Sequence, residues 1–223
     1  MDRRISKIIF KEMKYLLATI IMMSGIIGMS GAETTPLPAP KPCQNELRVS
    51  EALKVRHSER SFDASKPLSE QQISNLLWAA AGINRPESGK RTNPTALNAQ
   101  EIDVYVFTPD GVSLYEPKSH SLKSVVSGDH RALIAVSQEF VMDAPVVLLL
   151  VADTGRFEIP SKAATLMSMA DAGIASENIN LFCAANGLAT VPRASMDADG
   201  LRKLLNLSET QIPALNNPVG YSK

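Results

Sequence analysis

The amino-acid sequence predicts an α+β domain in which helices flank a sheet, rather than a regular alternation of strands and helices. Three segments carry this prediction. Residues 69–82 have the pattern of a capped amphipathic helix, residues 145–152 that of a buried strand, and residues 161–186 that of a long apolar helix. The chain has 223 residues, 44% hydrophobic and 21% charged, which is typical of one globular domain.

The helix predicted over residues 70–81 has a signal at each end. Ser69 and Gln72 have the spacing of a capping box, in which each side chain bonds the other residue's backbone N–H. Apolar residues then recur at intervals of three and four until Gly82, which ends the pattern. The segment is therefore an amphipathic helix with one face toward the core.

Strands are predicted after this helix. Residues 102–108 are rich in β-branched and aromatic side chains, Pro-Asp-Gly follows at 109–111, and residues 112–115 can return as the second arm of a hairpin. Residues 145–152 are almost entirely aliphatic, as expected of a central strand that is buried on both faces.

The long helix lacks proline over residues 161–186 and ends at Gly187, a plausible C-cap. Its small residues would allow a second helix to approach closely, either within the chain or from another copy: Ala170, Ala172, Gly173 and Ala175. Three closing elements follow it: a short strand over 188–191, a helix over 197–205 and an extended segment over 213–221.

The first 32 residues have the pattern of a secretory signal peptide. Five basic side chains precede an uncharged stretch over residues 15–32, which ends in the small residues of a cleavage site after Ala32. A retained membrane anchor is the alternative, although serine and glycine interrupt the stretch and its length is marginal for a span. Translation could start at Met1 or at Met13. The predicted location is the periplasm or cell envelope.

Removing this segment leaves 18 basic and 21 acidic side chains, a net charge of −3, whereas the full chain has 23 of each. Residues 33–43 contain four prolines and are expected to form an extended tether that does not pack. The folded domain is then expected to span residues 44–223.

Several classes of function are disfavoured. The balanced charge argues against a general nucleic-acid binder, and no glycine-rich nucleotide motif or Walker loop is present. His57, His120 and His130 lack the short spacing of a metal site, so no metal is expected. Cys183 lies in the apolar helix, where a core position is expected rather than a nucleophile. Trp78, beside Leu77, is also expected in the core.

Three polar segments are candidates for ligand binding. Residues 56–62, Arg-His-Ser-Glu-Arg-Ser-Phe, offer two guanidiniums and a hydroxyl suited to a phosphate monoester, although a solvated turn would look the same. Residues 90–100 form a polar loop, and residues 187–195 leave the long helix through small residues that allow close backbone approach. Each signal alone is weak.

Together these segments resemble the nitroreductase-like flavoprotein family, and especially the branch similar to dehydrogenases that oxidise thiazoline and oxazoline rings in peptides. The resemblance covers residues 47–221. Six ordered segments carry it: 56–62, 76–82 (Leu-Leu-Trp-Ala-Ala-Ala-Gly), 91–98 (Arg-Thr-Asn-Pro-Thr-Ala-Leu-Asn), 171–173 (Asp-Ala-Gly), 187–192 (Gly-Leu-Ala-Thr-Val-Pro) and 219–221 (Val-Gly-Tyr). It implies a mixed central sheet, a long central helix and an intertwined homodimer with FMN at the interface.

The resemblance also implies roles for individual residues. Arg56, His57 and Ser58 match the part of the family site that binds the phosphate and ribityl chain, and Arg60 matches the basic residue near the pyrimidine edge of the ring. Pro94, Thr95, Ala96 and Asn98 match the loop that reaches the flavin from the other subunit. Pro192, Arg193 and Ala194 match the backbone stretch that lies along the ring and donates toward N5. No catalytic side chain is implied, because flavin carries the redox chemistry.

The implied activity is transfer of reducing equivalents from NAD(P)H or another donor through the flavin to a nitroaromatic, a quinone or a similar acceptor. A non-catalytic flavin- or small-ligand-binding module of the envelope is the alternative. The chain departs from many relatives in two places. It stops at Lys223 instead of continuing into a basic tail, so Lys223 could replace that tail at the phosphate, and Arg193 stands where relatives often have an apolar residue.

Overall fold

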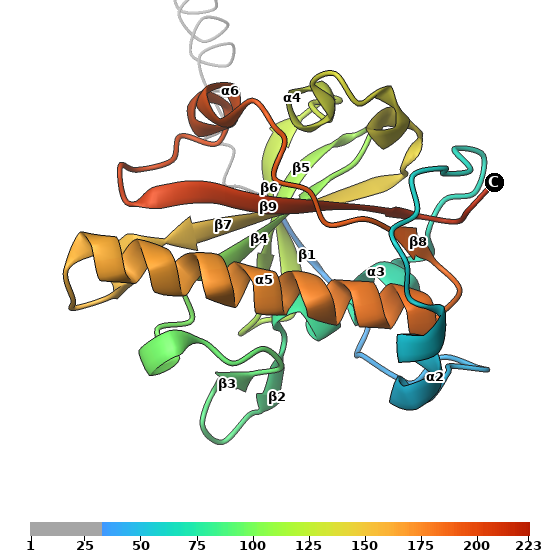
Figure 1. Ribbon diagram of the computed structural model, residues 1–223, viewed down its shortest axis with the longest axis horizontal. Coiled ribbons are helices and arrows are strands. Elements are labelled where there is room, and N and C mark those ends of the chain that lie inside the picture. Colours follow the sequence, from blue (N-terminus) through green and yellow to red (C-terminus); the bar gives the residue numbers. More distant parts are fainter. Residues whose placement is uncertain (1–32) are drawn as a thin grey trace, which may run out of the picture. The chain divides into compact units, whose positions relative to one another are not determined.

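The computed structural model describes residues 33–223, so the predicted signal segment lies outside the described residues. The described residues form a seven-stranded sheet with helices on both faces (Figure 1). The strands of the sheet are β1 (Thr34–Pro36), β4 (Ile102–Phe107), β5 (Gly111–Glu116), β6 (Ser121–Ser127), β7 (Val146–Asp153), β8 (Ala189–Thr190) and β9 (Gln211–Gly220). No helix among these residues is long and apolar enough to cross a membrane.

The predicted α+β class is confirmed, but the sheet is antiparallel rather than mixed. Its order is β1-β6-β5-β4-β7-β9-β8, and every neighbouring pair is antiparallel. The long helix connects β7 to β8 along the chain. These two strands are not neighbours in the sheet, because the final strand, β9, lies between them. β6 was not anticipated, because its Lys and Ser side chains lack a continuous apolar alternation.

The central strand β7 is buried on both faces, as predicted. Leu148 and Leu150 belong to the cluster on the α3 and α5 face, whereas Val147 and Leu149 belong to the cluster under α4 and α6. Because its side chains alternate between the two clusters, β7 belongs to both hydrophobic cores. Fully burying one leucine side chain contributes about 1.5–3 kcal/mol to the stability of the fold.

The helices agree closely with the sequence pattern. α3 begins after the Ser69 cap and ends before Gly82, and α5 spans Ser161–Ala185. Gly187 follows with a φ of 66°, which a glycine adopts without a Cβ penalty. The α-helices are α2 (Val49–Val55), α3 (Glu70–Ala81), α4 (Ala132–Ala135), α5 and α6 (Ala198–Leu204), and the 3₁₀ helices are η1 (Ala96–Asn98), η2 (Glu139–Asp143) and η3 (Thr154–Arg156). A small hairpin, β2 (Ile83–Arg85) with β3 (Lys90–Arg91), follows α3.

The proline-rich segment is extended, but the expectation that it does not pack was wrong. β1 pairs with β6, and Lys41 donates its N–H to Asn75 of α3 over 3.1 Å. The carbonyl of Pro38 accepts a hydrogen bond from Ser74. Prolines cannot donate, but their carbonyls and the intervening N–H groups can bond to polar side chains of α3. The folded unit therefore begins at Thr34 rather than at residue 44.

Candidate functional site

A cleft of about 240 Å³ lies between the segment after α2 and the C-terminal end of α5. Arg56 and His57 line one side, and Asn180 of α5 lines the other together with Gly187 and Thr190. The first and third polar segments predicted from the sequence therefore lie together in space.

The segment after α2 is held in place through its backbone. The N–H of Glu59 donates to the carbonyl of Thr190 in β8 over 3.0 Å, and Phe62 forms an isolated bridge with Ser222. The Glu59 carboxylate accepts from the N–H groups of Arg60 at 2.7 Å and Ser61 at 2.9 Å. These bonds, the one from Arg60 first, lower the pKa of Glu59. Glu59 thus keeps a fixed negative charge that shapes the turn.

The two arginines of this segment have no acidic partner among the described residues, whereas Nε2 of His57 lies 3.6 Å from the Glu59 carboxylate. Within residues 33–223, the side chains of Arg56 and Arg60 make no ion pair. Arg56 is half-buried in the cleft wall, whereas Ser58 and Arg60 are exposed. His57 is exposed, with Nδ1 at 2.8 Å from the carbonyl of Val55. Two guanidiniums and a hydroxyl can therefore meet an anion without first breaking an internal salt bridge.

The polar loop of residues 94–98 includes η1, and side-chain oxygens of Asp171 and Thr95 accept hydrogen bonds that help to hold it. Ala96 donates its N–H to Oδ2 of Asp171 in α5 over 2.7 Å, and Gln100 donates its N–H to Oγ1 of Thr95 over 2.9 Å. Leu97 and Asn98 have positive φ angles of 53° and 55°. Such angles are uncommon for residues other than glycine. The Leu97 side chain is 72% exposed, so the loop presents an ordered, apolar tip to its surroundings.

The stretch of residues 192–194 alternates in exposure. Pro192 and Ala194 are exposed, whereas Arg193 is buried. Arg193 exchanges backbone hydrogen bonds with Asn216, and its guanidinium donates to the side chains of Gln138 and Asn216. Its N–H is therefore not free to donate toward a flavin, which corrects the expectation for this residue. The exposed backbone of Ala194 remains as the candidate donor.

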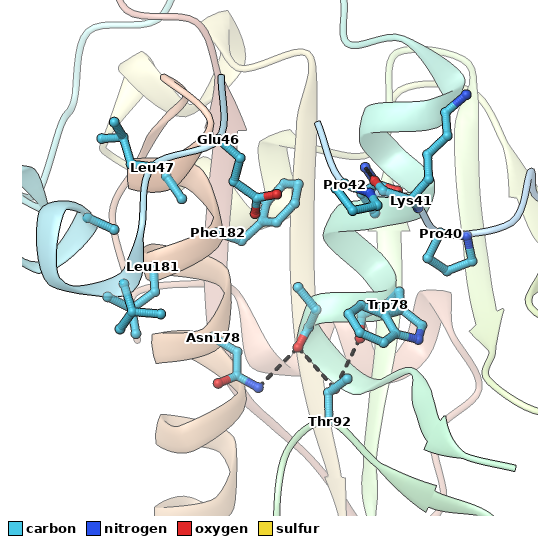
Figure 2. Close-up of a pocket in the computed structure, with 15 residues that line it drawn as sticks. Pro40, Lys41, Pro42, Glu46, Leu47, Trp78, Thr92, Asn178, Leu181 and Phe182 are labelled. Carbon is cyan, nitrogen blue, oxygen red and sulfur yellow. Dashed lines mark hydrogen bonds between the residues drawn. The ribbon is translucent and has the colours of Figure 1, made fainter. Parts of the chain in front are cut away.

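A larger apolar cavity of about 430 Å³ lies between α2, α3 and α5 (Figure 2). Trp78 and Phe182 line it, so Trp78 is not the core residue that we expected. Thr92 donates to the carbonyls of Trp78 and Ala79, and Asn178 also donates to that of Ala79, so these polar groups already have partners.

Cys183 is buried as predicted, and burial raises the pKa of its thiol. No group of three or more metal-ligating side chains occurs within residues 33–223.

With this geometry established, comparison with known proteins identifies the family. The model of the nitroreductase family matches residues 53–221. The chain belongs to the nitroreductase family. A protein of Methanocaldococcus jannaschii named as a nitroreductase is 29% identical over an alignment of 185 positions, with a coverage of 78% of this chain and 91% of that protein.

Solved structures agree with this assignment. A crystal structure of a Ralstonia eutropha JMP134 protein described as a nitroreductase shares 36% identity and a TM-score of 0.78, covering 88% of this chain and 92% of that one. The Escherichia coli microcin synthetase McbBCD complex matches at 18% identity and a TM-score of 0.64, covering 90% and 82%, which shows the fold alone. Membership supports a flavin-dependent oxidoreductase, whereas the branch that oxidises peptide heterocycles stays a prediction.

Within this member of the nitroreductase family, the predicted site residues fall into two groups. The cleft beside Arg56 includes Ala184 of α5, whereas the 94–98 loop is bonded to Asp171, thirteen residues earlier on the same helix. At 1.5 Å per residue, the cleft residues Asn180 and Ala184 lie about 14 Å and about 20 Å along the helix from Asp171. Figure 1 shows the loop, in green, near one half of α5, and α2 and β8 near its other end. One chain does not bring the two groups together.

The Lys223 side chain binds an acidic residue that does not line the cleft beside Arg56. Its ammonium pairs with Asp143 over 2.8 Å, although its backbone N–H donates to Ser61. An exposed pair of this kind contributes at most about 1 kcal/mol. The expectation that Lys223 replaces a basic tail therefore gains no support from its position, whereas Arg56 lines the cleft.

The sequence analysis missed the residues that support the site of this nitroreductase-family chain. Asn217 of β9 is fully buried, accepts from Ser176 and donates to Asn180 in the cleft wall. Its neighbour Asn216 is also fully buried and holds Arg193. A pair of asparagines in an otherwise apolar strand was the available signal, because buried amides require hydrogen-bonding partners.

Proposed function

We propose that the chain is an FMN-dependent oxidoreductase that acts as a homodimer. It would pass reducing equivalents from a nicotinamide or another donor to a small organic acceptor, such as a nitroaromatic or a quinone. The observation that carries the proposal is the cleft lined by Arg56, His57 and Glu59, whose backbone is tied to β8. Ser58 and Arg60 belong to the same segment and are exposed beside this lining. Because the chain belongs to the nitroreductase family, the anion proposed for this cleft is the phosphate of a flavin.

The residues present fit FMN. Arg56 and Ser58 would hold the phosphate and the ribityl chain through charge-assisted hydrogen bonds. Arg60 would stabilise negative charge at the pyrimidine edge of the ring. The exposed backbone of Ala194 would orient the ring, with Arg193 fixing that backbone from the opposite side. FMN, when bound, supplies the hydride chemistry, so the protein needs no acid–base pair of its own.

The distance between the two groups of site residues supports a homodimer. A second copy could bring its 94–98 loop to the cleft beside Arg56, which the first copy's own loop does not reach. The outer face of α5 suits such contact, because Leu166, Ala170 and Ile174 are exposed at four-residue spacing. A Cβ built on Gly173 would meet no atom within 4 Å, so a second helix could approach closely there.

Anaerobic reduction tests the activity. The purified protein should be yellow, lose its colour with NAD(P)H or another reductant, and regain it with a quinone or nitroaromatic. Stopped-flow mixing in which NAD(P)H never bleaches the flavin would exclude nicotinamide as the donor. Bound FMN that no reductant bleaches would instead favour the non-catalytic binding module.

Export from the cytoplasm is a separate part of the proposal. Cleavage after Ala32 would leave Glu33 at the new N-terminus, directly before the first paired residue of β1, Thr34. The predicted cleavage would therefore spare the sheet. N-terminal sequencing of protein from the cell envelope should give Glu33, whereas an uncleaved cytoplasmic chain would contradict export.

A further inference from the structure

We infer that Arg193 holds a buried positive charge behind the exposed backbone of Pro192 and Ala194, and that this charge makes the chain bind reduced FMN more tightly than oxidised FMN. This role rests on the proposed function, in which that backbone lies against the flavin ring. Arg193 is a positioning residue here, because it acts through its charge and through the stretch that it holds, without touching the flavin.

The guanidinium of Arg193 has hydrogen-bonding partners, but none of them is ionised. Nε donates to Oε1 of Gln138 over 2.9 Å, and Nη1 donates to Oδ1 of Asn216 over 2.6 Å. Nη2 donates to the carbonyl of Ile134 over 3.2 Å. Within residues 33–223, no carboxylate lies at ion-pair distance from this guanidinium. Its hydrogen bonds are therefore made, but its charge is not neutralised.

A second buried arginine has the counter-ion that Arg193 lacks. Arg131, just before α4, is also 7% exposed, but its guanidinium pairs with Asp129 over 2.7 Å. Burying an ion without a counter-ion costs free energy, so stability alone does not favour the arrangement at Arg193. Burial lowers the pKa of Arg193, but a guanidinium still carries its charge at neutral pH.

The charge and the backbone that faces the site form one rigid unit. The backbone of Arg193 exchanges hydrogen bonds with that of Asn216 in β9 at 2.8 Å and 2.7 Å. The Asn216 side chain also accepts from the guanidinium and donates to the carbonyl of Ser195 over 3.2 Å. The guanidinium carbon lies over the ring of Phe140, 5.7 Å from its centroid. The side chain therefore cannot turn to solvent without breaking these contacts.

A fixed cation discriminates between two charge states of a ligand. Two electrons and one proton from the donor leave one additional negative charge on a flavin ring. A positive charge near the ring binds that state more tightly, and burial lets the field of Arg193 act with little screening by water or salt. Arg60 is exposed, so a similar effect from Arg60 should weaken as salt is added.

Two variants remove the net charge in different ways. Arg193→Met deletes the guanidinium and keeps a long side chain. Gln138→Glu keeps the guanidinium and places a carboxylate at the present 2.9 Å contact, where it neutralises the charge. The second variant decides the test even if the first fails to fold, because it leaves the contacts of Arg193 in place.

The reduction potential of bound FMN, measured by anaerobic titration against a reference dye, reports the preference for reduced flavin. Both variants should lower that preference by about tenfold, which is a shift of about 30 mV to more negative potential for a two-electron couple. The shift should persist at high salt. Arg193→Lys keeps the charge and should stay close to the unmodified chain. Ser137→Glu adds the same charge as Gln138→Glu at an exposed neighbouring position, and it should also leave the potential unchanged.

The outcomes separate this inference from the proposed function. An unchanged potential in Gln138→Glu overturns the role of the charge while FMN binding stands. An equal shift in Ser137→Glu also overturns that role, since a charge at the surface would then have the same effect. FMN that does not bind to the unmodified chain overturns the proposed function and the role of Arg193 together.

Discussion

The backbone N–H of Glu59 donates to the carbonyl of Thr190 over 3.0 Å, and this bond joins the segment after α2 to the short strand β8. The two residues are far apart in sequence, and between them lie α3, most of the sheet and the long helix α5. Arg56 therefore reaches the end of α5 because the sheet and α5 position β8. The anion-binding cleft is thus a consequence of the fold rather than of one local motif.

Arg56→Ala should weaken FMN binding by about 10- to 100-fold, because each lost charge-assisted hydrogen bond costs about 1.5–3 kcal/mol. Fluorescence titration measures the change. Lys118→Ala removes the same charge from an exposed position between β5 and β6 and should leave the affinity as it is. Equal affinity for FMN in Arg56→Ala and the unmodified chain would remove Arg56 from the site.

Ile174→Glu should yield a monomer with weaker FMN binding, because it places a charge on the outer face of α5. Light scattering coupled to size-exclusion chromatography measures the mass. Val125→Glu is a matched control on β6, since Val125 is 39% exposed and Ile174 is 38% exposed. Both variants remaining dimeric would place the dimer interface elsewhere.

Gly82→Ala should destabilise the fold by about 1–3 kcal/mol through overpacking. A Cβ at this position would lie 2.4 Å from Cδ1 and 2.7 Å from Cα of Trp78. Because the Cα belongs to the helix backbone, replacing the indole in Trp78→Leu should not restore the loss. Urea unfolding gives the comparison, and full rescue by Trp78→Leu would show that the ring alone causes the clash.

Stability should fall as the pH drops below about 6.5, owing to His120. Burial lowers the pKa of this imidazole, which lies at 2.8 Å from the hydroxyl of Tyr115 and at 2.7 Å from that of Ser74. The folded chain keeps His120 neutral, whereas the unfolded chain takes up a proton near its ordinary pKa of 6.5. The stabilisation is therefore present above that pH and is lost progressively below it.

Unfolding measured across this range checks the effect of His120. His120→Gln should reduce the acid-side slope, while His130→Gln, beside the carbonyl of Ser127, should not. An unchanged slope in His120→Gln would show that other groups control acid stability.

Most of the fold could be predicted because its signals are local. The Ser69 cap, the aliphatic run of β7 and the glycine after α5 each specify an element from adjacent residues. β6 was missed because its side chains lack a continuous apolar alternation, and the proline-rich segment was misjudged because its structure depends on pairing with β6 across a long sequence separation. Such pairing leaves little trace in either strand alone.

The candidate site was predictable in its parts rather than in its arrangement. The resemblance assigned Arg56 and the 94–98 loop to one site, with the loop coming from the other subunit, but only the structure shows where along α5 each of them lies within one chain. The burial of Arg193 was also unforeseen, since it depends on Asn216 of β9, a distant strand. Side-chain direction of this kind follows from strand register, which the sequence of the segment does not specify.

The most direct test of the account is the stoichiometry of a mixed dimer. Arg56→Ala damages the cleft, and deletion of residues 94–98 removes the loop, so each variant alone should bind FMN poorly. Co-expressed with different affinity tags and purified through both, the mixed dimer should bind one FMN per two chains, because one complete site combines the intact cleft of one chain with the intact loop of the other. A mixed dimer that binds no FMN, or a single unmodified chain that binds it tightly as a monomer, would contradict a site shared between two copies.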